Sequence, residues 1–225
     1  ALGHSGQRAA ARQQRVRGLN ENLAREVLER PVWFEQLDDK AAAADEPDNP
    51  LATARLRPAQ VRLLKQAYQQ CYAEQPGFRE RVHSLLQLPM PPADGKRLPK
   101  APLDGYKLQG EFSVVPLYEA FYAQAGFIES IGIRIEQIQP QQLVCNAQER
   151  CFIEALMLFW QSFSSCLKAQ GLTTFNAAFQ QLTERLGAGG QSVPVEALAP
   201  FGHLLIDEFQ DISPQIVQWL QAVQR

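Results

Sequence analysis

The segment ERCFIEALMLFWQSFSSCLKAQ, Glu149–Gln170, is the stretch that most clearly indicates the fold. Its apolar residues recur at intervals of three and four, which is the spacing of one face of an α-helix. Gly171 follows directly and is a typical C-terminal stop for a helix. The segment therefore predicts a long amphipathic helix, whose apolar stripe comprises Phe152, Ala155, Leu156, Phe159, Phe163 and Cys166.

Helical spacing recurs through most of the chain, so the predicted fold class is mainly α. Pro58 and Pro116 suit the first turn of a helix, where a missing N–H costs nothing. In the segment after Pro58, one stripe contains Val61, Leu64, Tyr68, Cys71 and Tyr72. The predicted helices are 6–29, a short one at 33–37, 58–74, 78–86, 112–125, 149–170, a helix at 175–187 capped by Thr173 or Thr174, and one opened by Ser213–Pro214.

Few segments favour strands or long loops. Ile128 to Ile138 alternates isoleucine with polar residues, which predicts a strand or hairpin arm with one buried face. Prolines and glycines predict a long loop over residues 88–110, and polar residues predict loops at 38–52 and 188–200.

Composition indicates a globular protein without membrane or secretion signals. The 225 residues are 45% hydrophobic and 20% charged, with a formal net charge of −2. No apolar run approaches a membrane-spanning length, and the first residues lack the apolar core of a signal peptide. The cysteines form no C-x-x-C pair, so we expect a cytoplasmic protein without a zinc site or disulfide framework.

The segment HLLIDEFQD, His203–Asp211, places carboxylates where a short buried strand ends. Ser213–Pro214 then opens a helix, so the order is strand, acidic turn, helix. An aspartate at such a point can hold Mg²⁺, and a neighbouring glutamate can accept a proton from an attacking water. The alternative is that Asp207, Glu208 and Asp211 are ordinary solvated residues at the end of the strand.

LLIDEFQD followed by SPQ resembles motif II, the Walker B element, of superfamily 1 DNA helicases of the UvrD/Rep type. The resemblance covers about residues 202–223. It implies that Asp207 binds the Mg²⁺ of Mg-ATP and that Glu208 is the general base. It also implies that Gln210 and Asp211 couple the nucleotide state to the neighbouring motifs and to DNA.

The phosphate-binding loop that such helicases need, G-x-x-x-x-G-K-[ST], is absent from the chain. The resemblance therefore implies an internal part of a larger motor protein, inactive alone as an ATPase. Residues 1–20 would be a remnant of the RecA-like core domain 1A, and 20–170 a mostly helical inserted subdomain like 1B. Residues 171–225 would return to the core with a partial P-loop-type α/β element. The expected partners are DNA and the rest of the helicase chain. We expect no association with a membrane.

Two basic groups are candidate DNA contacts: Arg8, Arg12 and Arg15 on one helical face, and a loop with Lys96, Arg97, Lys100, Tyr106 and Lys107. For both groups an ordinary solvated surface is the competing interpretation. Trp33, Trp160 and Trp219 are candidate base-stacking platforms, but Trp160 and Trp219 lie within amphipathic helices, so we expect these two to pack in a core or between domains. Two other functions stay open: a non-hydrolysing module that binds DNA or protein, and a plain helical interaction domain.

Overall fold

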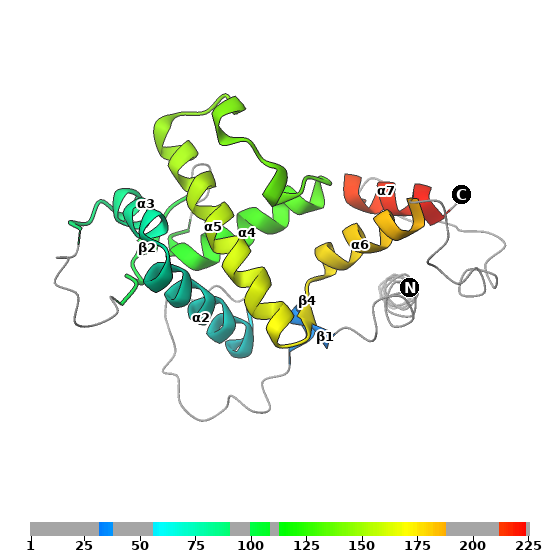
Figure 1. Cartoon of the computed structure of the whole chain (residues 1–225), viewed down its shortest axis with the longest axis horizontal. Coiled ribbons are helices and arrows are strands. Elements are labelled where there is room, and N and C mark those ends of the chain that lie inside the picture. Colours follow the sequence, from blue (N-terminus) through cyan, green and yellow to red (C-terminus); the bar gives the residue numbers. More distant parts are fainter. Residues whose placement is uncertain (1–31, 38–55, 91–99, 109–112, 188–211, 224–225) are drawn as a thin grey trace, which may run out of the picture.

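The computed structural model describes residues 32–37, 56–90, 100–108, 113–187 and 212–223, and these are mainly helical, as predicted (Figure 1). Within these ranges, no helix combines the length and the apolar character that crossing a membrane requires. Several predictions fall outside the described residues: the helix 6–29, the loop 38–52, the linker 188–200 and the motif II strand with its partial α/β element.

Helix α5, Ala147–Ala169, lies at the centre of the structure (Figure 1). It contacts α2, Pro58–Glu74, α3, Pro76–Leu86, and α4, Leu117–Ser130. Its first turn carries a capping box, in which Asn146 accepts from the Glu149 N–H and Glu149 accepts from the Asn146 N–H. Gly171 follows the helix with a positive φ of 67°. The predicted helix and its stop are thus confirmed, and the predicted stripe is buried except for half-buried Cys166.

Helices α2, Pro58–Glu74, and α3, Pro76–Leu86, form a pair that packs on α5. The helix predicted at 58–74 is confirmed with its buried stripe, and the second begins two residues earlier than predicted. Buried Gln60 joins α2 to the 3₁₀ turn η1, Phe34–Gln36, by donating to the Phe34 carbonyl at 3.0 Å. That bond fixes the residues around Glu35 against the packed helices α2, α3, α4 and α5, which we call the helical body.

Helix α4, Leu117–Ser130, differs from the prediction at both ends. Pro116 is its N-cap rather than a first-turn residue, and the strand predicted from Ile128 to Ile138 is wrong. Ile128 and Glu129 continue the buried face of the helix, which then closes in a Schellman motif. The Gly132 N–H donates to Glu129 O at 2.9 Å and the Ile133 N–H to Ile128 O at 3.3 Å, with Gly132 at φ 82°. The short 3₁₀ turns η3, Ile135–Gln137, and η4, Pro140–Gln142, complete the connection to α5.

The described strands are two residues long and make two small pairs. β2, Gly105–Tyr106, lies in the region predicted as loop and pairs antiparallel with β3, Val115–Pro116, which lies in the segment predicted as helix. β1, Val32–Trp33, pairs in parallel with β4, Leu172–Thr173, with Val32 opposite Leu172. The β1–β4 pair brings together the points where the chain leaves for the helical body and returns from it (Figure 1).

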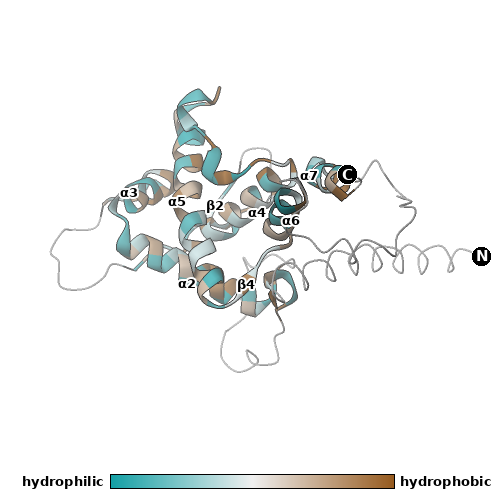
Figure 2. Ribbon diagram, turned by 45° about the vertical axis from the view of Figure 1, so that its right-hand side comes forward, coloured by the Kyte–Doolittle hydropathy of each residue, from teal (hydrophilic) through white to brown (hydrophobic). Residues whose placement is uncertain are grey.

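The buried apolar residues form two clusters rather than one. The larger cluster, which we call the body core, is built by α2, α3, α4 and α5 with Phe34. The smaller, the α6–α7 core, contains Trp33, Ala178, Leu182 and Trp219, from β1, from α6, Phe175–Gly187, and from α7, Pro214–Val223. Figure 2 shows that apolar and polar residues lie side by side along these helices, as amphipathic packing requires.

Candidate functional site

The motif II residues Asp207, Glu208, Gln210 and Asp211 lie outside the described residues, as do Arg8, Arg12, Arg15, Lys96 and Arg97. Their predicted roles in metal binding, catalysis and DNA contact stay predictions. Helix α7 begins at Pro214, as predicted, and its buried Trp219 packs edge-on to Phe179 of α6 at 5.5 Å. The segment that follows the motif is therefore anchored to α6.

Lys100 and Lys107 are exposed, while the aromatic residue beside them is packed against the helical body. Tyr106 stacks on Phe152 of α5, with ring centroids 5.4 Å apart. The two lysines are accessible to an anionic partner, but the Tyr106 ring is held by the protein itself.

The three tryptophans are buried, which agrees with the packing roles predicted for Trp160 and Trp219. Trp33 stacks on Phe175, with ring centroids 4.8 Å apart, and Trp219 contacts Phe179. Trp160 differs from the other two because its indole N–H reaches a buried carboxylate, Glu129, at 3.1 Å.

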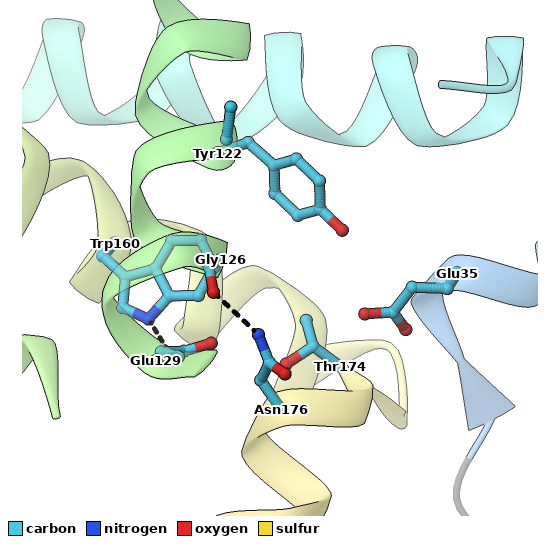
Figure 3. A pocket seen from close by; sticks show the side chains of 8 residues that line it. Glu35, Tyr122, Gly126, Glu129, Trp160, Thr174 and Asn176 are labelled. Carbon is cyan, nitrogen blue, oxygen red and sulfur yellow. Dashed lines mark hydrogen bonds between the residues drawn. The ribbon is translucent and has the colours of Figure 1, made fainter. Parts of the chain in front are cut away.

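That hydrogen bond belongs to a cavity of about 150 Å³, which we call the Glu35–Glu129 pocket (Figure 3). It lies where η1, α4, α5 and the start of α6 meet. Figure 3 shows the Glu35 carboxylate and the Tyr122 hydroxyl directed toward a common space, with Asn176 and Thr174 below it. The lining residues are Glu35, Tyr122, Ala123, Gly126, Glu129, Trp160, Thr174 and Asn176.

Glu129 is 4% exposed and sits on the inner face of α4. Burial raises the pKa of its carboxyl to about 7; the Trp160 hydrogen bond opposes this rise, and the charges of Glu136 and Glu35 add to it. The Asn176 side chain also opposes the rise. Among the described residues, no cationic side chain is among the groups that shift the pKa of Glu129.

Glu35 reaches the same cavity from η1. Its Oε1 accepts from the Phe175 N–H at 3.1 Å, at the first turn of α6, where the helix dipole favours negative charge. Its Oε2 is buried and has no hydrogen-bond partner in the described part of the chain. Burial nevertheless raises the pKa of Glu35 to about 7, against the opposing effect of backbone N–H groups. The two carboxyls thus change charge near neutral pH, a property typical of functional sites.

Asn176 links the pocket to α7. Its side-chain Nδ2 donates to the Gly126 backbone carbonyl of α4 at 3.2 Å. The backbone carbonyl of Asn176 accepts from Gln215 Nε2 of α7 at 2.7 Å. Thr174 caps α6 by accepting from the Ala177 N–H at 3.1 Å, which confirms one of the two predicted caps. The start of α6 therefore joins the helical body to helix α7.

Chemically, the Glu35–Glu129 pocket can exchange protons near pH 7 or hold a small cation between carboxylates and aromatic rings. It is a poor metal centre, because no three His, Cys, Asp or Glu side chains of the described residues gather in a metal-binding group. A second hollow, of about 500 Å³ between α2 and α5, is lined mainly by glutamine and serine and lacks such convergent charge.

Sequence reasoning missed this pocket, although one signal was available. Tyr118, Tyr122, Ala125 and Glu129 follow one another at helical spacing, so a helical reading would have placed Glu129 on the inner face. Comparisons of the chain with protein-family models, with curated proteins and with solved structures found no match.

Proposed function

We propose that the chain is part of the motor region of an ATP-dependent DNA helicase or translocase. The observation that carries the proposal is LLIDEFQD at 204–211, followed by a helix that begins at Pro214. In this proposal Asp207 holds the Mg²⁺ of Mg-ATP and Glu208 accepts the proton of the attacking water. Gln210 and Asp211 transmit the nucleotide state.

Two structural features support an inserted helical subdomain within such a motor. The helical body has its own core, and the parallel β1–β4 pair sets its departure and return points beside each other. Trp33 from β1 packs in the α6–α7 core together with Trp219. An insertion needs this arrangement, because its two ends must meet at one place on the parent domain.

The α7 contacts suggest how the motif would communicate with the helical body. Gln215 of α7 donates to the carbonyl of Asn176, whose side chain donates to the Gly126 carbonyl of α4. A shift of α7 on nucleotide binding would therefore act on α4 through this hydrogen-bonded chain. Accessible lysines such as Lys100 would contribute a salt-dependent attraction to DNA.

The test is hydrolysis by a polypeptide that carries this sequence together with a phosphate-binding loop. Glu208→Gln should lower DNA-stimulated ATP hydrolysis by a factor of about 100 or more while nucleotide still binds, because only the proton acceptor is lost. Glu80→Gln, at an exposed position of α3, is the matched control and should hydrolyse ATP normally. Unchanged hydrolysis by Glu208→Gln would contradict the proposal, and DNA binding without any hydrolysis would favour the binding module.

A further inference from the structure

We infer that the Glu35–Glu129 pocket binds an alkylguanidinium, the head group of an arginine side chain or of a free guanidine such as agmatine. The inference concerns a ligand site in the helical body and does not depend on the proposed helicase function. It rests on the cavity, its two carboxylates and its aromatic walls (Figure 3).

The first argument is unbalanced charge. Among the residues that the structure describes, the cavity lining contains two carboxyl groups and no lysine, arginine or histidine. The charged side chains that influence Glu129 are Glu136 and Glu35, both of the same sign as Glu129 itself. Buried carboxylates are normally paired with a cation or a metal. A cationic ligand would therefore relieve an electrostatic cost that the described residues leave in place.

The second argument is an unused hydrogen-bond acceptor. Glu35 Oε1 is occupied by the Phe175 N–H, but Oε2 is buried and has no partner among the described residues. A buried acceptor without a donor is energetically unfavourable, and more so when it is charged. A guanidinium presents several N–H donors in a fixed plane, so one ligand can donate to both carboxylates.

The third argument is shape and wall chemistry. A cavity of about 150 Å³ accommodates a ligand the size of benzene, which leaves room for a planar guanidinium and the first carbons of its chain. Tyr122 and Trp160 supply the aromatic walls, and arginine-type cations stack favourably on such rings. Ala123 lines the cavity and is exposed, so the cavity reaches the surface there and an alkyl chain could leave past it.

The test is a titration of the isotopically labelled 225-residue chain at pH 8, following the indole N–H signal of Trp160 by NMR. At this pH both carboxyls are mostly ionised, since their pKa values are about 7. The probes are agmatine, acetyl-arginine methylamide, the uncharged acetyl-citrulline methylamide and Mg²⁺. We expect saturable shifts with the two guanidinium probes at about millimolar concentration, and none with the citrulline probe.

The two guanidinium probes identify the source of the ligand. Tighter binding of acetyl-arginine methylamide indicates an arginine side chain of a polypeptide, and tighter binding of agmatine indicates a free guanidine. Glu35→Gln and Glu129→Gln should each weaken binding about tenfold or more, while Glu80→Gln should bind as the parent does. Equal responses to the arginine and citrulline probes, a response to Mg²⁺ alone, or no response to either guanidinium would overturn the inference. Because the parent chain alone gives these outcomes, a variant that fails to fold does not weaken the test.

Discussion

At the scale of single residues, Glu129 is the most consequential side chain in the described structure. Its folded-state pKa of about 7 lies above the ordinary value of 4.5, because burial disfavours the charged form. Stability from this group is therefore complete below about pH 4.5 and is lost as the pH rises through 7. The loss amounts to about 3 kcal/mol, as a shift of this size requires.

We accordingly predict that the free energy of unfolding falls between pH 5 and pH 8.5, measured by urea unfolding at each pH. Glu129→Gln should flatten this dependence, because glutamine keeps an acceptor for the Trp160 N–H but cannot ionise. Glu35→Gln should flatten it in the same direction, since the pKa of Glu35 is also raised to about 7. Glu80→Gln is the control, and an equally flat profile for that variant would contradict the assignment.

At the scale of elements, the C-terminal end of helix α4 shows how a single glycine can end a helix. Gly132 occupies the left-handed position of the Schellman motif, and a Cβ there would lie 2.7 Å from Gln218 Nε2. Gly126 lies inside the same helix, and a Cβ there would meet no heavy atom within 4 Å. We predict that Gly132→Ala destabilises the chain by about 1–2 kcal/mol. Gly126→Ala should stabilise it by about 0.5–1 kcal/mol. Chemical unfolding measures both, and a shift of the same sign in the two variants would contradict the helix boundary.

A comparison of α4 with α2 and α5 shows what sequence patterns can and cannot predict. Periodicity identified 58–74 and 149–170 because long amphipathic helices bury one continuous stripe. It failed after Ile128, where isoleucines spaced by two residues fitted a strand as well as a helix end, and Gly132 decided between them through its backbone conformation. Short pairs such as β1–β4 carry no pattern at all, since two residues cannot display a period.

The candidate pocket was beyond sequence reasoning for a different reason. Glu35, Glu129 and Asn176 are far apart along the chain and meet only because η1, α4 and α6 converge. Nothing in the spacing of one segment indicates which distant residue it will face. The carboxylates predicted to form motif II are the opposite case, because Asp207, Glu208 and Asp211 are close in sequence and their prediction rests on that pattern alone.

At the scale of the whole molecule, the presence of two cores predicts that the α6–α7 region can unfold locally while the helical body stays folded. Trp219 fills the centre of the α6–α7 core, whereas Phe159 is fully buried in the body core. Trp219→Ala should increase amide hydrogen exchange in α6 and α7 while α2, α3 and α5 stay protected, because the larger core loses no contact. Phe159→Ala should instead lower protection throughout the body, at a cost of about 3–5 kcal/mol.

Trp219→Phe is the matched control for the smaller core. The Trp219 indole N–H is buried without a hydrogen-bond partner in the described part of the chain, so phenylalanine keeps the aromatic contact with Phe179 and removes an unsatisfied donor. We expect exchange in α6 and α7 close to that of the parent chain, measured by mass spectrometry on the same peptides. If Trp219→Ala exposed the body helices as strongly as α6 and α7, the two clusters would be one cooperative core. The insertion-like organisation that supports the proposed motor region would then lose its energetic basis.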